Sequence, residues 1–158
     1  MNVLLSVKPK YAEKIVKGKK KYEFRRSIFK RNDIERVYIY SSSPVSKIIA
    51  SFKIEKILVD SPEKIWKLCQ KYAGISKKDF FVYFTNSDVA FAIKIGDIDS
   101  FKEAIDPYHI IEDFKAPQSF SYVPTNFLQS LFDVHDTESV KPAFSAESMS
   151  GISFMRRL

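Results

Sequence analysis

The chain has 158 residues, of which 45% are hydrophobic and 28% charged, and its formal net charge at pH 7 is +7. A chain of this length corresponds to one domain and can bury a core without disulfide or metal cross-links. Its scarce glycine and proline and its single cysteine exclude collagen, a disulfide-rich scaffold and wholesale disorder. Its longest apolar runs have five residues, whereas a membrane-spanning helix needs roughly 20, and its first residues lack the pattern of a secretory signal. We therefore expect a cytoplasmic protein that does not cross a membrane.

The first half of the chain predicts one short helix and three strands. The helix is expected at residues 9–17, and the strands at residues 21–26, 37–40 and 48–58. Pro9 is typical of a first helical turn, and Gly18 is typical of the position that follows a last turn. In the first of the strands, alternation places Glu23 and Arg25 on one side. A serine–proline turn at residues 41–44 precedes the third strand.

The second half predicts three short helices and two strands. The helices are expected at residues 61–74, 76–84 and 125–132, and the strands at residues 89–95 and 117–123. Ser61 and Ser76 are typical N-cap residues for the first two helices. Residues 97–116 have weak periodicity and are expected to form a connecting region. Because strands outnumber helices and do not alternate with them regularly, we expect an α+β fold, with a small twisted sheet or barrel and helices at its ends.

The positive charge is concentrated near the N-terminus. Residues 1–60 carry 15 Lys and Arg against 6 Asp and Glu, and the segment Lys8–Arg31 alone carries 11 basic and 2 acidic side chains. A cationic block of this size attracts polyanions, of which nucleic-acid phosphate is the most common. A solvated surface that only increases solubility is the alternative interpretation of the same charge.

The common motifs of catalysis and cofactor binding are missing from the sequence. Four glycines, at positions 18, 74, 96 and 151, cannot build a phosphate-binding loop or a dinucleotide fingerprint. Two histidines and one cysteine do not supply a usual zinc site, and Cys69 lies among apolar residues, as a core thiol would. His135 and Asp136 are a weak metal-binding candidate. We expect no metal and no cofactor.

The stretch Gly18–Arg26 combines a turn-forming glycine with basic and acidic side chains. Gly18 lets the chain turn sharply, which positions Lys20 at the start of the strand that carries Glu23 and Arg25. Glu23 is expected either to hold one of the two basic groups in a fixed position or to accept hydrogen bonds from a ligand. An ordinary exposed ion pair, worth about 0.2–1 kcal/mol, is the alternative.

This stretch resembles the signature Gly-x-Lys-x-x-Glu-x-Arg of the ASCH domain, a member of the PUA-like superfamily. The residues that match it are Gly18, Lys20, Glu23 and Arg25. Other segments of the chain are similar to one bacterial and archaeal branch of the family. These segments are Leu5–Pro9 with Tyr11 and Ala12, Tyr40–Pro44, Tyr72–Ser76 and Pro117–Tyr122. The resemblance covers residues 3–125 and leaves the C-terminal tail outside it.

The resemblance implies a small β-barrel of about five or six mostly antiparallel strands with short flanking helices, and a cleft whose floor carries the signature. We place the ASCH domain at residues 1–132, followed at 133–158 by a tail that either is flexible or adds an edge strand. The residues expected to bind a ligand are Lys20, Glu23, Arg25, Lys8, Ser43 and Ser119. Tyr22, Phe24 and Tyr40 are candidates for stacking on a base, and core packing is the alternative for each.

The resemblance also implies a role with RNA, because family members are mostly regarded as RNA-binding or as transcription- or translation-associated modules. Our main hypothesis is a regulator of this kind that binds RNA, or another nucleic acid, through a base or nucleotide in the cleft. The residues expected to contact phosphate outside the cleft are Lys19, Lys21, Arg26 and Arg31.

Two other classes of function stay open. One ASCH branch resembles an acetylcytidine amidohydrolase, and a hydrolase acting on modified nucleosides or on RNA would have Lys20 and Glu23 as its catalytic candidates. That branch has a threonine where this chain has Glu23, and residues 72–76 offer no glutamate for its remaining catalytic position. A catalytic Lys20 needs a lowered pKa, which Lys19 and Lys21 are expected to favour and Glu23 to oppose. The third class is a small-molecule or protein-binding module without a nucleic-acid role.

Overall fold

The structure is a computed structural model that describes residues 1–133 and 154–155. Its strands are β1 (Asn2–Val7), β2 (Tyr22–Arg25), β3 (Val37–Ser41), β4 (Lys47–Asp60), β5 (Ala90–Ile105), β6 (Phe120–Val123) and β7 (Phe154–Met155). Its helices are α1 (Pro9–Val16), α2 (Pro62–Cys69), the 3-10 turn η1 (Gln70–Tyr72), α3 (Lys77–Tyr83), α4 (Pro107–Ile110) and α5 (Phe127–Asp133). Every helix and strand expected from the sequence is present, with limits that differ by a few residues, except that β5 is much longer than expected.

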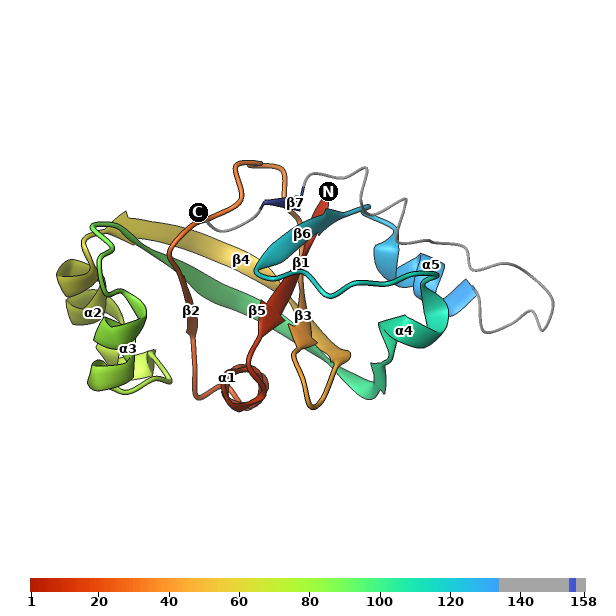
Figure 1. The fold of residues 1–158 in the computed structure, drawn as a ribbon, viewed down its shortest axis with the longest axis horizontal. Coiled ribbons are helices and arrows are strands. Elements are labelled where there is room, and N and C mark those ends of the chain that lie inside the picture. The colour runs from red at the N-terminus through yellow and green to blue at the C-terminus, as the bar shows by residue number, and fades with distance from the viewer. Residues whose placement is uncertain (134–153, 156–158) are drawn as a thin grey trace.

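The strands form one mixed sheet in the order β2-β5-β4-β3-β1-β6-β7 (Figure 1). The six strands that precede residue 134 curl strongly into a half-barrel with short helices around it, which confirms the expected α+β class. β1 runs parallel to β3, and the other strand pairs of the described residues are antiparallel. From the tail, β7 pairs with β6, while the metal candidate His135 and Asp136 lies outside the described residues.

β1 and β3 are buried on both faces of the sheet, which explains why their sequences are almost continuously apolar. On β1, Val3 and Leu5 face one core cluster, whereas Leu4 faces another. α1 packs on the first of these clusters, and α4 and α5 pack on the second. These central strands are therefore fixed from both sides, and their ends are rigid places from which to build a site.

β4 and β5 form a long antiparallel hairpin whose far end carries α2 and α3 (Figure 1). The pairing runs out to Asp60 and Ala90, the residues from which the chain leaves β4 and enters β5. A third core cluster joins α2 and α3 to β2 and β5, and it includes the buried Cys69, as expected for a core thiol. The hairpin thus holds the two helices beside the strand that carries the ASCH signature.

The prediction of a connecting region at residues 97–116 is wrong for the first half of that region, because β5 continues to Ile105. Backbone pairing with β4 maintains the strand, for example between Ser51 and Asp99. The side chains of this part are largely polar and exposed, so the sequence lacks the apolar alternation by which strands are recognised. Gly96 allows the close approach of the two strands, since a Cβ atom there would lie 2.8 Å from the carbonyl oxygen of Lys53.

The short helices begin and end where the sequence indicates. The hydroxyl of Ser61 accepts a hydrogen bond from the backbone N–H of Lys64, and that of Ser76 accepts one from Asp79. Gly18 follows α1 with a φ of 74°, in the left-handed region that favours glycine. None of the helices in the described part of the chain is long and apolar enough to span a membrane.

Phe80 is expected to be essential for the attachment of α3. Its side chain is fully buried, and its ring centroid lies 4.7–5.1 Å from those of four other aromatic residues, Phe24, Trp66, Phe81 and Phe84. Phe80→Ala should lower the free energy of unfolding by about 3–5 kcal/mol, measured by urea denaturation. The control Leu68→Ala, at a side chain of α2 that is 64% exposed, should change it by less than about 0.5 kcal/mol. Equal effects of the two variants would contradict the packing described here.

Candidate functional site

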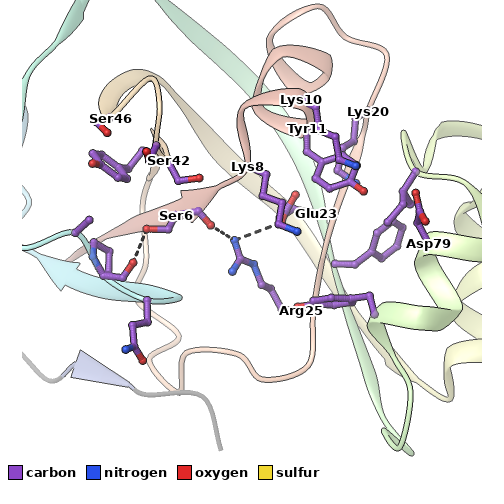
Figure 2. A pocket seen from close by; sticks show the side chains of 18 of the residues that line it. Ser6, Lys8, Lys10, Tyr11, Lys20, Glu23, Arg25, Ser42, Ser46 and Asp79 are labelled. Atoms are coloured by element: carbon purple, nitrogen blue, oxygen red, sulfur yellow. Dashed lines mark hydrogen bonds and ion pairs between the residues drawn. The ribbon is translucent and has the colours of Figure 1, made fainter.

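A cleft of about 720 Å³ opens between the curled sheet and α3 (Figure 2). One wall comes from the end of β1, the start of α1 and the turn after β3, and the opposite wall comes from α3. The floor, by which we mean Lys20, Glu23 and Arg25, belongs to β2 and the residues just before it. The structure therefore brings the three charged residues of the ASCH signature together in one concavity.

The first wall forms because β1 and β3 are parallel neighbours. Their carboxyl ends lie side by side, with Val7 opposite Ser41 in the register. α1 begins directly after β1, and the serine-rich turn at residues 42–46 begins directly after β3. The backbone N–H of Ser6 also bonds to the carbonyl of Ser119 at 2.9 Å, which brings the segment before β6 to the same place.

Glu23 and Arg25 are partners on the floor of the cleft. Their side chains are 9% and 8% exposed, and Glu23 Oε1 lies 3.3 Å from Arg25 Nη2. The guanidinium also donates to the carbonyl of Ser6 at 2.5 Å (Figure 2). A further bond goes to the hydroxyl of Ser119 at 3.4 Å. The pair is therefore buried and held by two other segments, which rules out the alternative of an exposed ion pair.

Two polar atoms of this pair are buried without a partner among the described residues. They are Glu23 Oε2, which can only accept a hydrogen bond when ionised, and Arg25 Nε, which can only donate one. Buried polar atoms are rarely left unpaired, because each costs about 1–3 kcal/mol. Both atoms are closed to solvent, so only a ligand whose binding shifts these side chains could pair with them. Such a ligand would have to offer one donor and one acceptor close together.

Lys20 is the most perturbed basic group of the site. It is 3% exposed, its ammonium donates to the carbonyl of Ala73 at 2.7 Å, and it lies 4.6 Å from the ring centroid of Phe24. Burial lowers the pKa of Lys20 from 10.5 to about 8, against an opposing effect of Glu23. The ammonium is therefore poised to exchange a proton slightly above neutral pH.

The cations expected to lower the pKa of Lys20 were misidentified from the sequence. Lys19 and Lys21 flank it in the chain, but their side chains are exposed, and the ammonium of Lys21 lies 4.2 Å from the ring centroid of Tyr72. The positive charges that do lower this pKa belong to Arg25 and Lys14. Neighbours in sequence along an extended segment point to opposite sides, so they were the wrong partners to choose.

The other predicted ligand-binding residues divide into two groups. Lys8 and Ser43 line the cleft and are exposed, so their side chains are available to a ligand. Ser119 is buried and contributes through its hydrogen bond to Arg25.

Of the stacking candidates, Phe24 and Tyr40 line the cleft, whereas Tyr22 packs in the third core cluster. Burial raises the pKa of Tyr40 to about 12, helped by its hydrogen bond to Tyr108, so its hydroxyl stays protonated. Tyr40 is almost fully buried and packs in the core cluster of Leu4, as the alternative of core packing predicts, and its neutral hydroxyl is not a base.

The four residues expected to contact phosphate lie outside the cleft lining. Arg26 lies 5.1 Å from the ring centroid of Tyr83, which itself lines the cleft, so this guanidinium is at the α3 rim. Arg31 forms a bidentate pair with Asp33, at 2.8 and 2.6 Å. Lys19 and Lys21 are exposed near the start of β2. Their contact with phosphate stays a prediction.

Sequence reasoning missed most of the α3 wall. Asp79, Val82 and Tyr83 line the cleft, whereas the sequence indicates only a helix that begins after Ser76 and no ligand contact from it. The backbone N–H of Asp79 does bond to Ser76, and its carboxylate is exposed to the cleft as well (Figure 2). No local signal could have found this, because the orientation of α3 depends on its packing on β2 and β5.

The described residues contain no group of three or more His, Cys, Asp or Glu that could hold a metal ion.

The sequence profile of the ASCH domain matches residues 5–115, and the chain belongs to this family. An ASCH domain-containing ribonuclease of Zymomonas mobilis is 29% identical over 136 residues, which cover 81% of this chain and 88% of that protein. The crystal structure of ASCH from Zymomonas mobilis superposes with a TM-score of 0.76 at 27% identity, covering 84% of this chain and 94% of that one. A large ribosomal subunit protein uL22 of Ureaplasma parvum is 28% identical over 91 residues, 58% of this chain and 29% of that protein. These matches confirm the family and the fold.

The buried Lys20 predicts a specific pH dependence of stability. Because its pKa is about 8 in the folded protein and ordinarily 10.5, the unfolded chain binds more protons between these values. The free energy of unfolding should therefore rise with pH across this window, by on the order of 3 kcal/mol, with no contribution to the slope below pH 8. The difference between wild type and Lys20→Met in urea denaturation should show this rise. The control Lys17→Met, at an exposed lysine of the same charge, should not differ from wild type in slope.

Proposed function

We propose that this protein binds RNA in the cleft and cleaves it at a phosphodiester bond. The observation that carries the proposal is the floor of the cleft, where a carboxylate, a guanidinium and a lysine of lowered pKa lie together. Glu23 Oε2 and Arg25 Nε, although closed to solvent, have no partner among the described residues, so a small shift of these side chains would offer one acceptor and one donor. In RNA, a 2′-hydroxyl lies next to a phosphate, so a single nucleotide supplies both the donor and the acceptor. DNA supplies only the phosphate. The relative that is named an ASCH domain-containing ribonuclease supports the same assignment.

The chemistry follows from the protonation states of the floor. Glu23 accepts the proton of the 2′-hydroxyl, and the 2′-oxygen forms a bond to the adjacent phosphorus. The bond from phosphorus to the 5′-oxygen breaks, and the ammonium of Lys20 donates a proton to that leaving oxygen. The products are a 2′,3′-cyclic phosphate and a 5′-hydroxyl, and solvent returns the proton from Glu23 to Lys20. A lysine with a pKa of about 8 is charged at neutral pH and gives up its proton readily, as a general acid must.

The exposed cations around the cleft hold the rest of the RNA in this proposal. Lys8 and Lys10 line the cleft opposite α3, and Arg26 lies at the α3 rim. Lys19 and Lys21 extend the positive surface along the residues before β2. Phosphates bound along this path give affinity without sequence preference, and binding should weaken with salt, with a log–log slope of about −0.7 per phosphate.

RNA binding without cleavage is the second candidate function. The edge of a nucleobase also presents a donor beside an acceptor, and the serine-rich turn adds the hydroxyl groups of Ser42, Ser43 and Ser46 to the lining. A base held in this way would need no reaction. The transcription- or translation-associated role that the family resemblance implies belongs to this candidate.

Among hydrolases, the ribonuclease is better supported than the acetylcytidine amidohydrolase. The amidohydrolase branch has a threonine at the position of Glu23 and a glutamate in a later segment. This chain has Glu23 in place of the threonine. In place of the later glutamate, its later segment brings only the carboxylate of Asp79, on α3, to the cleft. The first departure changes the length and the charge of a group that would attack an amide, and the second shortens the other group by one methylene.

The test of the proposed function is cleavage of a labelled single-stranded RNA, followed by gel separation of the products. Wild type should cleave it, and Lys20→Met and Glu23→Gln should each lower the rate by about 10²–10⁴-fold, the usual contribution of general acid–base catalysis. The control Lys17→Met removes a charge from the exposed residue that follows α1 and should keep the rate. An RNA with a single 2′-deoxy nucleotide should resist cleavage at that position.

The other outcomes separate the remaining hypotheses. RNA that is retained in filter binding at low salt but stays intact would favour binding without cleavage. Retention of neither RNA nor DNA would contradict both candidates and leave the small-molecule or protein-binding module. Release of acetate from acetylated cytidine would restore the amidohydrolase hypothesis.

A further inference from the structure

Three consecutive carbonyl groups, at the end of η1 and in the two residues that follow it, accept hydrogen bonds from α1 and from the residues that lead into β2. The carbonyl of Tyr72 accepts from the backbone N–H of Lys21 at 2.9 Å. The carbonyl of Ala73 accepts from the ammonium of Lys20 at 2.7 Å, and that of Gly74 accepts from the ammonium of Lys14 at 3.2 Å. We call residues 72–74 the carbonyl clamp.

Gly74 is the residue that lets Lys20 enter this clamp. A Cβ atom at Gly74 would lie 2.5 Å from Cβ, 2.6 Å from Cγ and 2.9 Å from Cδ of Lys20. These atoms form the base of the lysine side chain, which is attached to the backbone and cannot swing away as a flexible tip could. The φ of Gly74 is also 64°, which disfavours any other residue. Only glycine therefore leaves room for the stem of Lys20 in its present position.

We propose that the carbonyl clamp, with Gly74 as its positioning residue, holds the Lys20 ammonium in place for proton transfer in the cleft. The clamp fixes the stem by contact and the ammonium by one hydrogen bond, which leaves two N–H groups for a ligand. Its catalytic meaning rests on the proposed function. The clamp also couples the motif lysine to the α2–α3 unit, since both ends of residues 72–74 lead into helices of that unit.

Displacement of Lys20 from the clamp should change its protonation. The titratable or charged groups that act on it come from three elements: Glu23 and Arg25 from β2, Lys14 from α1 and Cys69 from α2. The ring of Tyr11, on α1, lies 5.3 Å from the ammonium. Burial is nonetheless the largest influence on the pKa of Lys20. A side chain pushed out of the clamp enters the open cleft, regains water and should return toward its ordinary pKa.

The test is an NMR titration of the ε-methylene groups in protein labelled with ¹³C-lysine, without RNA, with the Lys20 signal assigned through its loss in Lys20→Met. Wild-type Lys20 should titrate near pH 8, and Gly74→Ala should shift the midpoint upward by at least about one pH unit. The matched control is Gly18→Ala. Gly18 has a similar φ of 74°, but nothing lies within 4 Å of an added Cβ atom, so the variant suffers the backbone strain without the contact. Because Gly18 lies in the turn that leads to Lys20, this variant measures the effect of backbone strain alone, and its Lys20 midpoint should shift less than that of Gly74→Ala.

An unchanged midpoint in Gly74→Ala, or an equal shift in Gly18→Ala, would overturn the proposal. Should Gly74→Ala not fold, Lys14→Met decides, because it removes an exposed donor to the clamp and a positive charge that lowers the Lys20 pKa. It should move the Lys20 midpoint upward relative to Lys17→Met, which removes an equal charge from the residue that follows the same helix. No difference between these two variants would count against the clamp.

The pH profile of RNA cleavage gives the second readout. With Lys20 as general acid, the wild-type rate should fall as pH rises through about 8, and in Gly74→Ala this fall should move to higher pH. A purely structural effect of Gly74→Ala would lower the rate at all pH values without moving the midpoint. The titration uses RNA-free protein, so a missing ribonuclease activity and a missing clamp are separate results.

Discussion

The burial of three charged side chains on one short edge strand and the residues just before it is the constraint on which the rest of the site depends. Lys20, Glu23 and Arg25 are each less than a tenth exposed, and removing such groups from water costs several kcal/mol per ion unless they are paired. Glu23 and Arg25 compensate each other, and the backbone carbonyls of Ser6 and Ala73 accept from the two cations. The compensation is incomplete, as the lowered pKa of Lys20 shows. The fold therefore buries an incompletely compensated cluster of charges at the edge of the sheet, where the charged side chains of an edge strand are ordinarily solvated.

The sheet supplies those compensating groups through its topology. The parallel pair β1–β3 places Ser6 and the serine-rich turn on one side of β2, and the β4–β5 hairpin carries Ala73 to the other side. Neither side alone could hold the three charges, because each provides a carbonyl for only one of the two cations. The long hairpin, which at first sight only enlarges the sheet, is thus needed to bring a second wall to the site.

The sequence predicted the features of the fold that depend on interactions between residues close together in the chain. Helix starts at Ser61 and Ser76, the turn at Gly18 and the alternation in β2 follow from short-range chemistry, and the structure has all of them. The second half of β5 could not be predicted in this way, since it is held by pairing with β4 and not by its own apolar pattern. Likewise the cations that act on Lys20 come from across the fold, as does Asp79 in the cleft. The motif predicted the residues on the floor of the cleft. The wall formed by α3 could not be predicted, because it depends on how that helix packs in the fold.

The unpartnered atoms of the floor decide which ligand chemistry the cluster suits. A phosphate alone would satisfy Arg25 Nε and bring negative charge next to Glu23, which the carboxylate would repel. A group that is only a donor would satisfy Glu23 and leave the guanidinium unpaired. A hydroxyl beside a phosphate satisfies both, and it presents the proton to the carboxylate and the charge to the cations. In the proposed function, these unpartnered atoms would therefore favour a ribonucleotide over its deoxy counterpart once the side chains shift to admit it.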